Sequence, residues 1–306
     1  MGIMDVLLKE LPVELEFLTG FLNTAPHRYK VYEIPKRSGG SRVIAQPAKK
    51  LKYIQTIAID KYLSGLPVHS AAMAYRPNVS IKDNALKHKN SKYLLKMDFV
   101  DFFQSIVPSD LEKHALKFKE DVTGEDLKYF KKIFFWIPKG KRSYRLSVGA
   151  PSSPFISNTV MYEFDCAVSK LCEVDGVTYT RYADDLTFTT NKENVLFKYP
   201  EIIKKIIENV DGPNLKINSK KTIFSSKKNN RHVTGLVLNN ENKISLGRDK
   251  KRFIKSLVYK YKVGGISDVH EINQLKGLVA YAKFMEPSFY TSLVKKYGLD
   301  LILRLK

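Results

Sequence analysis

Apolar residues near the start of the chain recur at helical spacing and then alternate. From Met4 to Leu22 they fall every three or four positions around a proline, which predicts two short helices. Tyr29 to Ile34 alternates, turn residues follow from Arg37 to Gly40, and Arg42 to Ala45 continues as a strand, so this stretch predicts a β-hairpin. Lys50 to Leu63 returns to helical spacing and predicts an amphipathic helix.

Strand composition surrounds acidic residues in the middle of the chain. Tyr93 to Met97 predicts a strand with Asp98 at its end, and a polar helix start follows at Ser105 to Asp110. Val177 to Thr190 is the clearest predicted hairpin, because Thr, Tyr and Val residues flank Ala183-Asp184-Asp185. We therefore expect two acids at the tip of this hairpin.

The last third of the chain is predicted to be mostly helical. Tyr199 to Val210 predicts a helix, and Lys216 to Ser225 and His232 to Asn239 predict two short strands. Arg248 to Tyr261 and Val269 to Tyr297 predict basic helices. No repeat or flexible linker interrupts the pattern, so we expect one continuous assembly of subdomains.

The composition is that of an ordinary folded protein, with 306 residues, 43% of them hydrophobic, and a mean hydropathy of −0.27. The longest apolar run, Ile133 to Ile137, is far shorter than the roughly 20 residues of a membrane span. Cys166 and Cys172 are too few for a disulfide scaffold or a four-ligand zinc site. We therefore expect a protein of the reducing cytoplasm with no membrane association.

The net charge of +21 is the first indication of a partner. From Asn214 to Lys306 the chain has 16 lysines and 4 arginines against 6 acidic residues, a net of +14. Such an excess favours binding of nucleic acid, because neutralising phosphates releases counterions. The alternative is a helix face that is merely solvated, which most charge runs are.

Asp98, Asp184 and Asp185 are the candidate metal ligands. Nucleotidyl transfer by two metal ions needs carboxylates that are held rigidly and converge on the ions. A strand end and a hairpin tip can present acids in this way, and Mg²⁺ takes a few carboxylates together with phosphate oxygens and water. The alternative is a solvated turn, since Asp is common in turns.

Several blocks containing or flanking these acids resemble the motifs of reverse transcriptases. Thr180 to Thr187, with Tyr182-Ala183-Asp184-Asp185 inside it, resembles the catalytic hairpin, and Met97 to Phe103 resembles the first palm motif. Leu146 to Pro154 resembles the motif that positions template and nucleotide, although Ser147-Val148 replaces the usual Pro-Gln. Asn218 to Thr222 resembles the motif whose lysine lies near the leaving pyrophosphate.

The resemblance implies an α+β right-hand polymerase fold with fingers, palm and thumb. Residues 1–90 would form N-terminal helices and fingers, and residues 241–306 a short basic helical thumb. Residues 91–240 would form the palm, with an antiparallel sheet and a finger insertion around 111–145.

The resemblance also implies roles for single residues. Asp98, Asp184 and Asp185 would be catalytic, and two Mg²⁺ ions would be bound by Asp98, Phe99, Asp184 and Asp185. The nucleotide would be bound by Lys36, Arg42, Asp101, Phe103, Gly149 and Lys221. Phe103 matches the bulky position that collides with a ribose 2′-OH and favours dNTPs.

Two further motifs resemble signatures of the bacterial retron branch. They are Asn84-Ala85-Leu86-Lys87-His88, just before the first palm motif, and Val233-Thr234-Gly235. We expect His88 to be structural beside the RNA rather than catalytic. The expected RNA- and primer-binding residues are Asn84, His88, Tyr182, Val233, Thr234, Gly235, Arg248, Lys250, Lys251, Arg252 and Lys255.

A retron reverse transcriptase, as the resemblance implies, copies its cognate noncoding RNA from the 2′-OH of an internal guanosine. The branched RNA–DNA product is called msDNA. Further expected partners are dNTPs, an effector protein of the same anti-phage defence system, and a host RNase H that removes the template.

Two alternatives stay open at this point. The chain could be another bacterial reverse transcriptase, of the abortive-infection, diversity-generating or group II intron type. It could instead be an RNA-binding scaffold or antitoxin that restrains an effector, which the basic tail would suit equally well. Three converging acids favour catalysis, because they repel one another unless a cation is bound.

Overall fold

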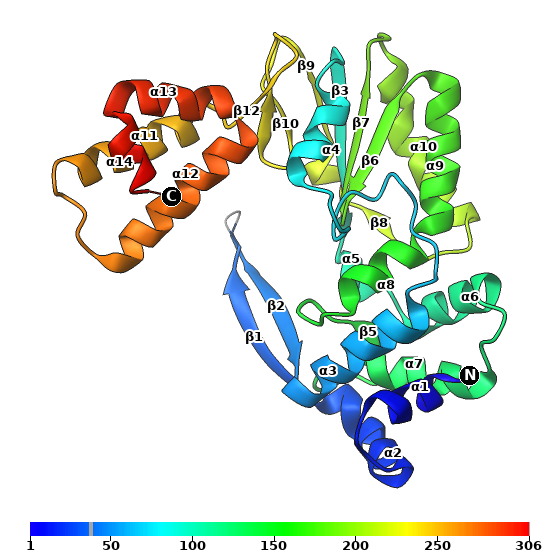
Figure 1. The fold of residues 1–306 in the computed structure, drawn as a ribbon. Coiled ribbons are helices and arrows are strands. Elements are labelled where there is room, and N and C mark those ends of the chain that lie inside the picture. Colours follow the sequence, from blue (N-terminus) through cyan, green and yellow to red (C-terminus); the bar gives the residue numbers. More distant parts are fainter. Residues whose placement is uncertain (37–38, 306) are drawn as a thin grey trace.

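A five-stranded antiparallel sheet forms the centre of the computed structural model, which describes residues 1–36 and 39–305 (Figure 1). The strand order is β6-β7-β3-β8, and β9 also pairs with β3. The central strands β3 and β7 are buried over most of their length. The sheet consists of β3 (Tyr93–Val100), β6 (Thr178–Tyr182), β7 (Asp185–Thr190), β8 (Lys216–Ile217) and β9 (Ile223–Ser226).

Strand β3 is longer than predicted. It continues to Val100, so Asp98 lies inside the strand and the prediction that it ends the strand was wrong. Asp98 is the register partner of Asp185 on β7, while Phe99 and Val100 pair with β8. These partners are far away in the sequence, and only the assembled sheet extends the strand past Asp98.

The segment from Lys216 to Ser225 is not one strand as predicted. It contains β8 and β9, separated by the 3-10 turn η4 (Ser219–Lys221). This turn brings Lys221 toward β3, because the amide of Asn218 donates to the carbonyl of Asp98 at 2.8 Å.

The segment from His232 to Asn239 is also divided. It forms a hairpin of β10 (Arg231–Val233) and β11 (Leu236–Leu238). Thr234 and Gly235 join the strands with φ of +47° and +81°. Positive φ at both central residues is the geometry of a two-residue hairpin turn.

The N-terminal predictions are confirmed. Helices α1 (Ile3–Glu10) and α2 (Leu15–Thr24) lie on either side of Pro12, and β1 (Tyr29–Pro35) pairs with β2 (Ser41–Pro47). Arg37 and Ser38 of the predicted turn lie outside the described residues. The ribbon of β1 and β2 extends away from the helices (Figure 1), and most of its residues are exposed.

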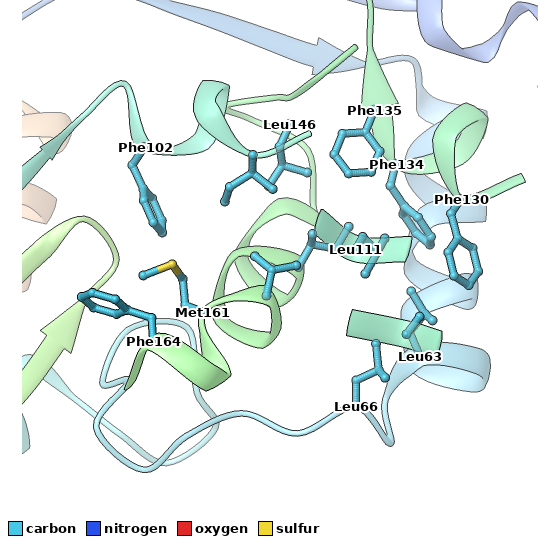
Figure 2. Close-up of a cluster of buried hydrophobic side chains, with 14 of the residues drawn as sticks. Leu63, Leu66, Phe102, Leu111, Phe130, Phe134, Phe135, Leu146, Met161 and Phe164 are labelled. Carbon is cyan, nitrogen blue, oxygen red and sulfur yellow. The ribbon is translucent and has the colours of Figure 1, made fainter. Parts of the chain in front are cut away.

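A large hydrophobic core joins the N-terminal helices to the sheet. In Figure 2 the rings of Phe130 and Phe134 lie on the side of Leu63, and Phe135 lies next to Phe134 on the side of Leu146. The same view places Phe102, Met161 and Phe164 toward the strands of the sheet, so the N-terminal helices and the sheet share one continuous interior. The helices around this core are η1 (Ala25–His27), α3 (Lys49–Ala58), η2 (Ile59–Leu63), α6 (Pro108–Phe118), α7 (Gly124–Phe134), α8 (Ser153–Val160), α9 (Tyr162–Asp175), η3 (Val195–Lys198) and α10 (Tyr199–Asn209), with β4 (Phe135–Trp136) and β5 (Arg145–Leu146).

The C-terminal helices have a second core of their own. The stretch from Val269 to Tyr297 is helical as predicted, and it is divided into two helices because α12 (Val269–Met285) ends before Pro287. Ala85 and Leu94 also belong to this core, which ties the helices to the sheet. The other elements here are α4 (Ile81–His88), β12 (Ile244–Ser245), α11 (Arg248–Lys262), α13 (Pro287–Tyr297) and α14 (Leu299–Leu303).

No helix in the described part of the chain is long and apolar enough to cross a membrane. The division into fingers, palm and thumb at residues 90 and 240 stays a prediction.

Candidate active site

Three aspartates meet where β3 and the β6–β7 hairpin lie side by side. Asp98 and Asp185 are directly opposed in the β3–β7 register, and Asp184 precedes Asp185 in the turn. The amide of Phe99 donates to the carbonyl of Asp184 at 3.2 Å. The sheet therefore places carboxylates from two sequence-distant motifs at one position.

The turn that carries two of these acids has an unusual backbone. Ala183 has φ of +56°, in the left-handed region, and its side chain is buried. A residue with a Cβ is disfavoured there by roughly 1–2 kcal/mol. Surrounding contacts must therefore hold the turn, and they fix the direction in which Asp184 and Asp185 project.

The carboxylates repel one another in a partly desolvated setting. Burial, and then the charges of Asp185 and Asp98, raise the pKa of Asp184 to about 6. Burial also raises the pKa of Asp185. The site therefore has more negative charge than its surroundings neutralise.

Lys221 partly compensates this charge. Its ammonium donates to both carboxylate oxygens of Asp98 at 3.0 Å each, and this hydrogen bonding raises the pKa of Lys221. The amide Nδ2 of Asn218 approaches the same carboxylate at 3.4 Å.

The donor set fits a divalent cation in its chemistry. Within residues 1–36 and 39–305 no three His, Cys, Asp or Glu side chains are already arranged as a metal site. The three carboxylates are nonetheless close enough that the charges of Asp185 and Asp98 add to the effect of burial in raising the pKa of Asp184, and a bound cation would relieve this repulsion. The side chain of Phe99 is buried, so Phe99 can offer such an ion only its backbone.

A cavity of about 300 Å³ has Tyr75 in its wall, and the phenol of Tyr75 is near enough to Asp184 for the charge of that carboxylate, together with the larger effect of burial, to raise its pKa. Phe103 forms part of its wall, and its ring stands edge-on to Tyr75 with 6.4 Å between centroids. Gly149 forms another part of the wall. The predicted nucleotide residues Phe103 and Gly149 are thus brought together, and a bulky ring lines the space as expected. The lining residues are Lys52, Tyr75, Phe103, Ser147, Val148, Gly149, Ala150, Pro151, Ser153 and Pro154.

Gly149 touches the β1–β2 ribbon closely. It has φ of +119°, and a Cβ built there would lie 3.0 Å from Cγ2 of Ile44 and 3.4 Å from the carbonyl oxygen of Ala45. The amide of Ala45 donates to the carbonyl of Val148 at 2.9 Å. Only glycine lets the cavity wall and the ribbon meet in this way.

The remaining residues that were predicted to bind the nucleotide do not line this cavity in the described structure. Burial raises the pKa of the Tyr75 phenol, and the charge of Arg42 opposes this shift. Arg42 is therefore close to Tyr75, which lines the cavity. Asp101 is exposed, with φ of +46°, at the start of α5 (Phe102–Ser105). Lys36 is exposed near the tip of the ribbon and does not line the cavity in the described structure.

The motif from Asn84 to His88 is buried in α4. The ring nitrogens of His88 lie 2.8 Å from Oγ1 of Thr189 and 2.7 Å from Oγ1 of Thr180, on the two strands of the hairpin that carries Asp184 and Asp185. Asn84 is 1% exposed and His88 0% exposed, which contradicts a direct contact of these side chains with RNA in this conformation. The expectation of a structural His88 agrees with this position.

The turn at Val233 to Gly235 packs on the same helix. Oγ1 of Thr234 donates to the carbonyl of Ile81 at 3.1 Å, and Val233 is fully buried in the second core together with Ala85. Burial contradicts an RNA contact by the Val233 side chain as well. The two motifs therefore form one joint between the sheet and the C-terminal helices, in which Gly235 is exposed and Thr234 half-buried.

The basic residues of helix α11 differ in exposure and in the partners they contact. Arg248 and Arg252 are exposed. Lys251 pairs with Glu286, and Lys250 lies over the ring of Tyr281 at 4.1 Å. Lys255 is half-buried near Phe289, so the two arginines are the freest of the five predicted contacts. Tyr182 is half-buried next to the acids.

Sequence reasoning missed the residues behind the turn that carries Asp184 and Asp185. Arg181 and Asp165 form a fully buried ion pair, and Asn158 contacts the same guanidinium. The one local signal was an arginine inside a predicted strand of Thr and Tyr residues, because an arginine that is buried there needs an acidic partner. The position of that acid could not be inferred.

Comparison with known proteins places most of the chain in one family. Residues 34–238 match the family model described as reverse transcriptase (RNA-dependent DNA polymerase). The chain is 44% identical to the retron Ec83 reverse transcriptase of Escherichia coli over 99% of its own length and 93% of that protein. It is 38% identical to the retron Ec73 reverse transcriptase of Escherichia coli, covering 89% of this chain and 88% of the relative.

Among solved structures, telomerase from Candida albicans in complex with a fragment of telomeric RNA has a similar fold. The TM-score is 0.50 at 15% identity, covering 87% of this chain and 56% of the telomerase chain. This likeness concerns the fold alone and supports the right-hand polymerase architecture. With the family match and the near-full-length relatives, it follows that the chain belongs to the reverse transcriptase family, as an RNA-directed DNA polymerase of the retron type.

Proposed function

We propose that this reverse transcriptase makes msDNA by copying a cognate structured noncoding RNA from the 2′-OH of an internal guanosine. The observation that carries the proposal is the 44% identity to a retron reverse transcriptase over nearly the whole chain. The three converging aspartates support it, because an intact acid set is what synthesis needs and a pure scaffold does not.

In the proposed reaction the priming oxygen attacks the α-phosphorus of a dNTP, and the bond to pyrophosphate breaks. Family membership implies dependence on a divalent metal, and we propose two Mg²⁺ ions held by Asp98, Asp184, Asp185 and the backbone of Phe99. The ions would supply Lewis-acid activation of the priming hydroxyl and charge stabilisation of the leaving group.

The other residues bind and orient the nucleotide. Phe103 would exclude a ribose 2′-OH, and Gly149 would keep the cavity wall close to the ribbon. Lys221 would move from Asp98 to the pyrophosphate oxygens as negative charge develops there, with Arg42, Lys36 and Asp101 near the triphosphate.

The RNA and the growing duplex would be held by the C-terminal helices. Arg248 and Arg252 are exposed on α11, and a guanidinium suits phosphate oxygens. A-form duplexes are gripped mainly through shape, phosphates and 2′-OH groups. We assign fingers to residues 1–90, palm to 91–240 and thumb to 241–306, and we place the reaction in the bacterial cytoplasm as part of an anti-phage system with an effector protein and host RNase H.

The proposal is tested with purified protein, its cognate RNA, dNTPs and Mg²⁺. We expect extension that starts on the RNA without an added primer and that is lost in Asp184→Asn with Asp185→Asn. Extension only from an added DNA primer would indicate another reverse transcriptase class. Full synthesis by the double variant would overturn the assignment of the acids.

A further inference from the structure

Arg181 and Asp165 form a fully buried ion pair directly behind the catalytic turn. Both side chains are 0% exposed. Nε of Arg181 donates to both oxygens of Asp165 at 2.9 and 3.1 Å, and Nη2 donates to Oδ2 at 2.6 Å. Asp165 also accepts a hydrogen bond from the phenol of Tyr179 at 2.7 Å. The guanidinium is therefore fixed in position and orientation.

The third nitrogen of the same guanidinium holds the turn. Nη1 of Arg181 donates to the carbonyl of Ala183 at 3.2 Å. Ala183 is the residue with φ of +56° whose carbonyl carbon is bonded to the nitrogen of Asp184. A contact at this carbonyl fixes the peptide plane from which Asp184 departs.

The pair also connects the turn to three other parts of the fold. Nη1 of Arg181 approaches Oδ1 of Asn158 on α8 at 3.3 Å, and Asn158 donates to the carbonyl of Ala74 at 2.8 Å. The backbone of Arg181 bonds to Ala71 and Met73 at 2.8 Å each. Asp165 lies on α9. The turn is therefore held in place by contacts with two helices and a loop, in addition to its own strands.

We propose that Arg181, locked by Asp165, is a positioning residue that sets the geometry of the catalytic carboxylates. The inference rests on the proposed catalytic role of Asp184 and Asp185. Arg181 does not touch the substrate and acts only through the Ala183 carbonyl. A buried ion pair is costly to desolvate, and hydrophobic residues fill such space equally well. The presence of this pair behind a strained turn agrees with a role in positioning the turn.

Lysine cannot replace arginine in this role. The planar guanidinium supplies five donors in a rigid fork, which here reaches Asp165 and Ala183 at once, whereas an ammonium is a single point of charge. Arg181→Lys therefore keeps the positive charge beside Asp165 and releases the turn.

Arg231 provides a matched control. It is 1% exposed, and in the described structure its guanidinium, unlike that of Arg181, donates to backbone carbonyls alone, those of Ser91, Leu238 and Asn239. These carbonyls lie between the sheet and the second core and not at the catalytic turn. Arg231→Lys therefore introduces the same chemical change at a buried arginine that supports structure alone.

The experiment compares full-length wild type, Arg181→Lys and Arg231→Lys in single-nucleotide incorporation, with kcat and the KM for dNTP measured separately. Thermal unfolding and calorimetric binding of Mn²⁺ to the protein without nucleic acid are measured on the same samples. For Arg181→Lys we expect kcat to fall by about tenfold to a hundredfold, since misplacement by about 1 Å can cost a hundredfold. We expect weaker Mn²⁺ binding and a KM for dNTP within about threefold of wild type.

Arg231→Lys should lower the unfolding temperature while kcat stays within about threefold of wild type. An Arg181→Lys protein whose kcat and Mn²⁺ binding match those of Arg231→Lys would overturn the inference. If Arg181→Lys does not fold, Tyr179→Phe replaces it, because this change removes one hydrogen bond from Asp165 and keeps the ion pair. A smaller fall in kcat is then expected, and wild-type kcat would overturn the inference.

The same assay separates this inference from the assignment on which it rests. Asp184→Asn is included throughout. If Asp184→Asn retains synthesis, the catalytic assignment fails. If it loses synthesis while Arg181→Lys behaves like Arg231→Lys, the assignment stands and the positioning role of Arg181 is wrong.

Discussion

Replacement of Gly149 by alanine tests how the cavity and the β1–β2 ribbon are coupled. The new Cβ would lie 3.0 Å from Cγ2 of Ile44, and the backbone would have to keep φ of +119°. Residues with a Cβ in such sparsely populated regions cost about 1–3 kcal/mol. The end of the Ile44 side chain can shift by a few tenths of an ångström, so backbone strain is the larger part of the cost.

The strain should appear mainly in nucleotide binding. The free protein can relieve it by letting the wall at Gly149 move relative to β2. The nucleotide-bound protein needs that wall in place, because Gly149 lines the cavity with Phe103. A cost of about 1–2 kcal/mol in the bound state corresponds to a rise of roughly 5–30-fold in the KM for dNTP.

Gly140→Ala is the matched control for this prediction. Gly140 also has a positive φ, of +74°, but a Cβ there meets nothing within 4 Å, and the residue does not line the cavity. Both variants should unfold at lower temperature than wild type. Steady-state incorporation should show the raised KM in Gly149→Ala alone, and equal KM values in the two variants would refute the coupling.

Two further predictions concern the cavity wall and the joint at α4. Phe103→Val should reduce the preference for dNTPs over rNTPs by at least about tenfold, because it removes the ring that would meet a 2′-OH; unchanged discrimination in competition assays would contradict the role of Phe103. Burial and, to a smaller extent, the charge of Lys87 lower the pKa of His88 to about 3, so the folded state keeps His88 neutral while the unfolded chain takes up a proton below about pH 6.5. Stability from this residue is therefore complete above about pH 6.5 and is lost as the pH falls toward 3. His88→Gln should remove about 1.4 kcal/mol of the stability loss between about pH 7.5 and 5.5 in urea unfolding. Burial lowers the pKa of His114 to about 4, so the loss of stability that His114 causes at low pH should remain in His88→Gln. An unchanged pH dependence of stability in His88→Gln would show that His88 is not a buried neutral group.

The acid-bearing hairpin was predictable because its signals are local. Tyr182 to Asp185 interrupts two runs of β-branched and aromatic residues, and a turn with acids at that place follows from spacing alone. The ribbon of β1 and β2 was predictable for the same reason. The length of β3 was not, since residues after Met97 are held as a strand by β7 and β8.

The roles of the two retron motifs were harder to predict. Asn84 and His88 are polar and looked suited to RNA, yet α4 buries both of them together with Ala85. Their spacing of four residues did place them on one helix face, which was a usable signal for a shared interior contact. What His88 faces is decided by Thr180 and Thr189, about a hundred residues away in the sequence.

The most direct test of the central claim is made on nucleic acid isolated from cells that express this chain with its native flanking DNA. The sample is treated with RNase A and with a debranching enzyme and then resolved by size. We predict a small discrete DNA whose mobility shifts on debranching and which is absent when Asp184 and Asp185 are both replaced by Asn. Soluble protein that binds RNA but yields no such DNA, or a DNA that persists in the double variant, would contradict the account.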